Sequence, residues 1–146
     1  MTKKHEGAGI DRKLHDPVKD KLPPVFPLDL SRTKSISDLV RGMADYRQGE
    51  FAKAVDRLRL SLSPGAEVAY RDGIAYLFLA MAQQKLGRIE EARESMAKAR
   101  VVAEEKFPKV DRGQLLGSSW SDWVRFQVIR REAEELVKPP APVSQK

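Results

Sequence analysis

The sequence predicts an all-α fold built from two antiparallel helical hairpins and a C-terminal capping helix. Three observations support this prediction. Between residues 36 and 137, apolar side chains recur at helical spacing, and no stretch reads convincingly as a strand. Two similar local sequences place Gly49 and Gly87 at matching positions. Proline-containing segments at 23–27 and 139–142 flank the region and disfavour helix there.

The overall composition is that of one soluble domain with tails. Hydrophobic residues make up 41% of the 146 positions and charged residues 33%. The sequence lacks an apolar run long enough to span a membrane, and its first thirty residues lack the apolar core of a secretory signal. With no cysteine, disulfides and thiolate zinc sites are excluded. We therefore expect a cytoplasmic location and no membrane association.

Start and stop signals divide the chain into helices and connecting segments. Ser35 and Asp38 have the spacing of a capping box, and Ser119 and Asp122 repeat it. A Ser-Pro pair at 63–64 also resembles a helix start. The predicted helices span residues 35–48, 51–62, a part of 66–86, 89–105 and 119–138. The remaining segments are a disordered or extended N-terminal arm (1–34), a loop (107–118) and a disordered tail (139–146).

The two hairpins share a pattern with an offset of 38 residues. Gly49 and Gly87 favour a tight turn with positive φ, and Ala54 and Ala92 allow the two helices of each hairpin to approach closely. This pattern resembles the tetratricopeptide repeat. In the second repeat, the residues that carry the resemblance are Tyr76, Leu79, Ala80, Gly87, Ala92, Met96 and Ala99.

The resemblance covers about residues 36–137. The stretch from Tyr76 to Arg93 and the ending Ile129–Leu136 also look like repeats that follow the kinase domain in some bacterial serine/threonine kinases. Departures from the family pattern are Asp38, Arg41 and Gln83, which stand where bulky apolar or aromatic residues are usual.

A third repeat is missing, so we expect the last helix to cover the exposed face of the second hairpin. Its covering residues would be Trp123, Phe126, Ile129, Ala133 and Leu136.

The resemblance implies a protein-binding scaffold whose first helices line a concave groove. The groove positions carried over to this chain are Leu39, Val40, Met43, Tyr46, Arg47, Leu77, Phe78, Met81, Gln84 and Lys85. This mostly apolar set suits an amphipathic helix or an apolar peptide. The same residues would instead be core if a rotated hairpin, a second copy or the N-terminal arm covers them. One hypothesis is that Val25–Leu28 lies along the groove in cis.

Other function classes are disfavoured. The two histidines, His5 and His15, lie in the predicted arm, and the sequence contains no phosphate-binding loop or local nucleophile motif. We therefore expect no catalysis, metal or cofactor. The net charge of +6 is spread along the chain without a basic stripe, so no nucleic acid is expected and an accessory role there is the weakest alternative. A stronger alternative is a helical appendage of a bacterial signalling protein, with no open groove and with self-association as a homodimer.

The hairpin register is testable by mutation. Gly87→Val strains a turn that needs positive φ, and Ala92→Phe overpacks the contact between two helices. Each should lower the free energy of unfolding by roughly 1–3 kcal/mol. Thermal or urea denaturation measures this, and unchanged melting for both variants would contradict the register.

Overall fold

The computed structural model describes residues 30–62, 68–110, 113 and 117–139. These residues form five α-helices and one short 3-10 helix, with no strand among them, which confirms the all-α prediction. The helices are α1 (Leu30–Arg47), α2 (Phe51–Ser61), α3 (Ala69–Lys85), α4 (Ile89–Lys106), η2 (Gly117–Ser119) and α5 (Trp120–Leu136). Most of the predicted arm, including Val25–Leu28, the Ser63-Pro64 pair and most of the tail lie outside the described residues.

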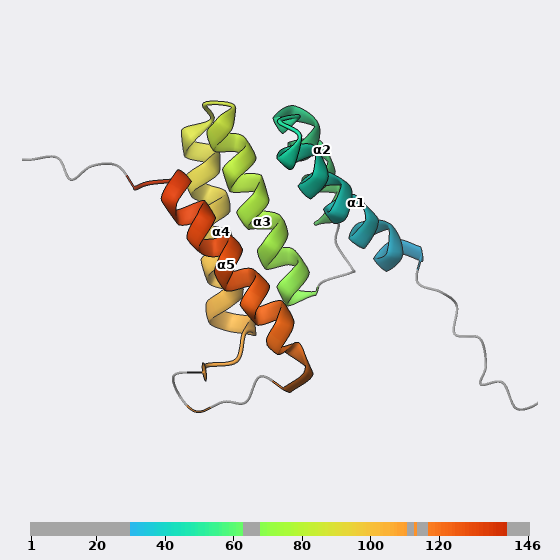
Figure 1. Ribbon diagram of the computed structural model, residues 1–146, viewed down its shortest axis with the longest axis vertical. Coiled ribbons are helices and arrows are strands. Elements are labelled where there is room, and N and C mark those ends of the chain that lie inside the picture. Colours follow the sequence, from blue (N-terminus) through green and yellow to red (C-terminus); the bar gives the residue numbers. More distant parts are fainter. Residues whose placement is uncertain (1–29, 63–67, 111–112, 114–116, 140–146) are drawn as a thin grey trace, which may run out of the picture.

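Two antiparallel hairpins, α1–α2 and α3–α4, stand side by side, and α2 packs against α3 (Figure 1). Gly49 has a φ of 82° and Gly87 a φ of 76°, so both hairpin turns use the left-handed conformation expected from the sequence. A side chain at either position would meet no atom within 4 Å, so backbone conformation alone favours glycine there.

The first helix begins earlier than the sequence predicts. It starts at Leu30 instead of Ser35, so Ser35 lies inside the helix and does not cap it. The Ser35 side chain is buried, and its hydroxyl donates a hydrogen bond to the carbonyl oxygen of Ser61 at the end of α2. The Ser35 hydroxyl, which the local pattern predicted to cap α1, therefore joins α1 to α2 instead.

The second predicted capping box is also wrong. Ser119 precedes α5 but makes no side-chain hydrogen bond to the helix. Its φ of −88° and ψ of 5° are turn angles that continue the 3-10 helix, whereas a capping serine normally has extended angles.

Helix α3 is the centre of the fold, because it contacts all four other α-helices. Apolar residues surround its axis, and Leu77, Phe78 and Met81 are almost completely inaccessible to solvent. At Gly42, an added Cβ would lie 2.8 Å from the Cγ of Leu58, so α1 and α2 also pack at backbone distance.

Helix α5 covers α3, as the capping-helix prediction requires. Phe126 is fully buried, and its ring meets the ring of Phe107 edge-on with centroids 4.6 Å apart. Ala133 is buried, and Trp123, Ile129 and Leu136 are partly buried against the core. The five predicted covering residues therefore all contribute to the core or pack against it.

The contact between α3 and α5 depends on the missing side chain of Gly73. An added Cβ there would lie 2.9 Å from the Cε2 atom of Phe126 and 3.3 Å from the Cζ atom of Phe107. Both rings are buried and have little room to move.

We expect Gly73→Ala to destabilise the protein by up to about 2 kcal/mol. Alanine gains up to about 1 kcal/mol in helix propensity, but overpacking costs roughly 1–3 kcal/mol. Urea denaturation measures the change. Phe126→Leu provides the control background, because adding Gly73→Ala to it should cost less than adding Gly73→Ala to the unmodified protein. A stabilised single variant would contradict the close packing of α5 on α3.

Candidate functional site

Helices α1, α3 and α5 form one face of the protein, with α1 and α5 on opposite sides of α3 (Figure 1). The three helices run in the same direction. The N-terminal part of α5 meets the N-terminal part of α3 where Phe126 contacts Gly73, and the C-terminal parts of α1 and α5 meet where Arg47 contacts Glu132. We call this surface the concave face, because it corresponds to the groove side predicted from the sequence.

An ion pair crosses the concave face from α1 to α5. The guanidinium of Arg47 donates two hydrogen bonds to the carboxylate of Glu132, with N–O distances of 2.6 and 2.7 Å. The same guanidinium carbon lies 5.4 Å from the ring centroid of Phe78 and 5.6 Å from that of Tyr46. The bidentate geometry and the two rings hold Arg47 in a defined position over α3.

The ion pair changes the acid–base properties of its surroundings. Hydrogen bonding from Arg47 lowers the pKa of Glu132 below its ordinary value, because it stabilises the carboxylate. The pKa of Tyr46 is raised, first because the phenol is desolvated by burial and second because Glu132 is negatively charged.

The predicted groove residues do not form a continuous open surface. Five are buried and belong to the core: Leu39, Tyr46, Leu77, Phe78 and Met81. Met43 and Gln84 are partly exposed, and Val40, Arg47 and Lys85 are exposed. The aromatic contacts of Tyr46 with Phe51 and Phe78 show the cause, since the floor of the predicted groove is filled by packing between helices.

Two accessible parts of the concave face remain. Ile36, Val40 and Met43 follow one another at helical spacing on the side of α1 that ends in Arg47, and we call them the α1 stripe. Val40 is 59% exposed and Ile36 47% exposed. Near the C-terminal ends of the helices, a cavity of about 280 Å³ is lined by Tyr46, Lys85, Glu132, Glu135 and Leu136.

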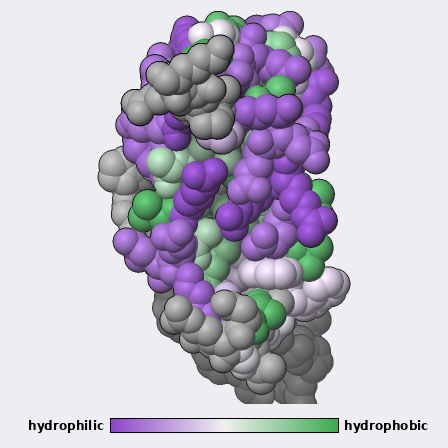
Figure 2. Space-filling view, turned by 90° about the vertical axis from the view of Figure 1, so that its left-hand side faces the viewer, coloured by the Kyte–Doolittle hydropathy of each residue, from purple (hydrophilic) through white to green (hydrophobic). Residues whose placement is uncertain are grey.

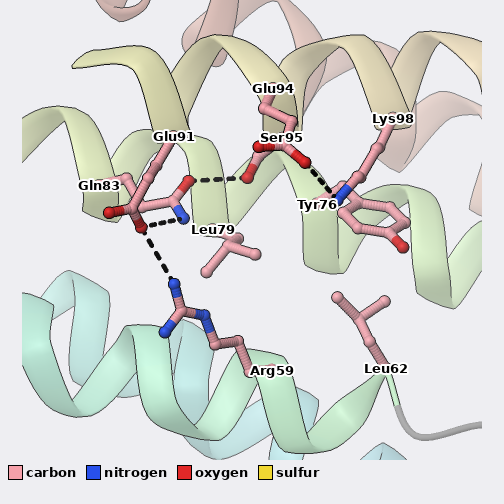
Figure 3. Close-up of a pocket in the computed structure, with 9 residues that line it drawn as sticks. All are labelled: Arg59, Leu62, Tyr76, Leu79, Gln83, Glu91, Glu94, Ser95 and Lys98. Atoms are coloured by element: carbon pink, nitrogen blue, oxygen red, sulfur yellow. Dashed lines mark hydrogen bonds and ion pairs between the residues drawn. The ribbon is translucent and has the colours of Figure 1, made fainter. Parts of the chain in front are cut away.

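A second cavity, of about 400 Å³, lies between α2, α3 and α4 (Figure 3). A hydrogen-bond chain crosses one end of it. Arg59 pairs with Glu91 at 3.0 Å, Gln83 donates to the same carboxylate at 3.3 Å, and the hydroxyl of Ser95 donates to the side-chain oxygen of Gln83 at 2.7 Å. Gln83 and Ser95 are both buried, and this chain joins the two hairpins.

This second cavity was not predicted from the sequence. Gln83 is a departure from the repeat pattern, but its partners Ser95 and Glu91 are 12 and 8 residues away and Arg59 belongs to the other hairpin. The available signal is a polar residue at a core position of α3 that faces another polar core residue on α4.

The surface on the α4 and α5 side is mainly hydrophilic, with small separate hydrophobic areas (Figure 2). The large hydrophobic residues exposed on these two helices are Val101 on α4 and Trp120, Val124 and Val128 on α5, with Ile89 at the start of α4 less exposed. Within the described residues, no cluster of histidine and acidic side chains is arranged to hold a metal ion. No helix in the described part of the chain has the length and apolarity needed to cross a membrane.

Comparison with known proteins gives one match. A family model described as "Tetratricopeptide repeat" matches residues 73–98, which cover most of α3 and the first half of α4. No curated protein and no solved structure matches the chain. The match supports a tetratricopeptide-like repeat in the second hairpin, where the sequence pattern is also strongest, and such repeats generally indicate a protein–protein interaction module.

The Arg47–Glu132 pair gives a pH-dependent contribution to stability. Because the pKa of folded Glu132 is depressed, its stabilisation is present above the ordinary glutamate pKa of about 4.3 and is lost as pH falls through the lower folded value. Both side chains are more than a third exposed, so Glu132→Gln should cost less than about 1 kcal/mol at neutral pH. The melting temperatures of the unmodified protein and of the Glu132→Gln variant should converge at acid pH.

Glu134→Gln is the matched control, since Glu134 pairs with Arg130 within α5. Only Glu132→Gln should also speed amide hydrogen exchange in the last turn of α1. Equal exchange in the two variants would mean that the pair does not couple α1 to α5.

Proposed function

We propose that the protein is a non-catalytic scaffold that binds a segment of a partner protein along its concave face. The observation that carries this proposal is the α1 stripe, an apolar row that ends at the Arg47–Glu132 pair and in which Ile36 and Val40 are exposed. An amphipathic helix is the partner segment that fits best, because its apolar side chains recur at the spacing of Ile36, Val40 and Met43. Polar groups of the segment would meet Arg47, Gln84 and Lys85.

The burial of the groove floor refines the proposed site. Leu39, Tyr46, Leu77, Phe78 and Met81 support the surface from below, and binding would use the side chains of the α1 stripe and the cavity of about 280 Å³ beside Lys85. A partner would therefore contact a mixed surface, with apolar residues on α1 and charged residues at the helix ends.

Three broader parts of the proposal rest on sequence alone. These are a cytoplasmic location, a bacterial origin and a place within a signalling protein related to serine/threonine kinases. The absence of cysteine and the resemblance of residues 76–93 and 129–136 to kinase-associated repeats support them.

The proposal predicts that binding depends on Val40. A library of displayed helical peptides is selected on the full chain, and the selected peptide is titrated into Val40→Glu and Val101→Glu by fluorescence anisotropy. Val40 and Val101 are 59% and 49% exposed, so the two variants make the same change at similarly exposed helical positions on different faces. We expect Val40→Glu to weaken binding about tenfold or more, equivalent to about 1.4 kcal/mol, and Val101→Glu to leave it unchanged.

Equal weakening in both variants, or none, would contradict binding at the concave face. Light scattering on the same proteins tests the main alternative. If the unmodified chain is a dimer that Val40→Glu dissociates, the α1 stripe serves self-association instead of binding a partner segment.

A further inference from the structure

A second surface lies on the other side of α3 from the concave face. At 3.6 residues per turn, Tyr76 and Gln83 project from α3 nearly opposite to Phe78 and Lys85. The cavity of about 400 Å³ shown in Figure 3 adjoins another cavity, of about 360 Å³. The two cavities share Tyr76, Glu94 and Lys98. We call the combined depression the outer groove.

Apolar side chains form much of the outer groove. The cavity of about 400 Å³ is lined by Leu62, Leu79 and Tyr76. Figure 3 shows the Tyr76 ring and Leu62 facing the same open space. The cavity of about 360 Å³ continues along α4 past Val101 and Val102. Since Val101 is half exposed, this part of the helix is open to solvent in the described chain.

The charged groups around the outer groove are already paired with one another. Arg59 binds Glu91 at 3.0 Å, and Lys98 binds Glu94 at 2.8 Å. An uncharged apolar occupant would leave both pairs intact, whereas a charged one would need to compete with them. The groove is therefore suited to a segment without charge.

We propose that the outer groove binds residues 22–28 of the same chain. This run, Leu22-Pro-Pro-Val-Phe-Pro-Leu28, has no charged residue and lies between Lys21 and Asp29. Its three prolines favour the polyproline II conformation, which binds grooves lined by aromatic rings at a low entropic cost. Tyr76 provides such a ring in the outer groove.

The position of α1 places Ser35 beside the end of α2, next to the outer groove. The hydrogen bond from Ser35 to Ser61 holds α1 against the end of α2, and the next residue, Leu62, lines the outer groove. Leu30 lies five residues before Ser35, which is about 7.5 Å along the helix axis. From Leu30 the chain back to Phe26 extends about 12 Å in a polyproline II conformation and back to Leu22 about 25 Å.

Paramagnetic relaxation tests the proposal on the full chain. The protein has no cysteine, so Lys21→Cys gives a single site for a nitroxide label next to the segment. We expect the methyl signals of Leu62, Val101 and Val102 to lose most of their intensity, while those of the α1 stripe keep theirs. Loss at the α1 stripe instead, or no loss at either surface, would overturn the proposal.

A mixed sample identifies the source of the segment. Protein that carries the nitroxide but no isotope enrichment is mixed with isotope-enriched protein that carries no nitroxide. Loss of the Val101 signal in this mixture would show that the segment of a second copy occupies the groove, which would overturn docking within one chain. Docking within one chain is supported if the signal is lost only when the nitroxide and the isotopes are in the same chain, and is full in the mixture.

Two pairs of variants give the controls. Phe26→Ser should restore the methyl signals, and Leu14→Ser, also in the arm, should not. Val101→Glu should restore the signals of Leu62 and Val102, and Val40→Glu should not. The roles of Val40 and Val101 are reversed relative to the partner-binding test, so failure of one proposal leaves the other measurable.

Discussion

Every other α-helix of the described chain packs against α3, so α3 needs buried residues on most of its circumference. A helix in a small domain normally buries one stripe and exposes the rest. Helix α3 buries eleven of its seventeen residues, including small residues such as Gly73, Ala75 and Ala80. The small residues let neighbouring helices approach, while Leu77, Phe78 and Met81 fill the space between them.

The consequence for binding is that residue type at a groove position does not predict exposure. The concave face was predicted as an apolar floor, but its apolar residues on α3 are consumed by packing against α1, α2 and α5. The accessible apolar side chains lie beside the floor, on α1. On the opposite side of α3, the polar residues Gln83 and Ser95 occupy core positions and line an open depression.

Local signals predicted the parts of the fold that local chemistry determines. Gly49 and Gly87 mark both turns because few other residues tolerate positive φ, and Phe126 and Ala133 identify the buried face of α5 by their spacing. The start of α1 was mispredicted because Ser35 forms a hydrogen bond with a residue 26 positions away. The Arg47–Glu132 pair joins residues 85 apart, and the chain from Arg59 to Ser95 spans two hairpins. Such contacts depend on tertiary geometry, which single-sequence patterns do not contain.

The bridge from Arg47 to Glu132 also changes how an array of this kind comes apart. In a linear stack of repeats each unit contacts only its neighbours, so either end can fray without any effect on the other. Here the first helix is bonded directly to the last across the middle one. Loosening of one end of the molecule therefore removes this one contact from the other end, at a cost of less than about 1 kcal/mol.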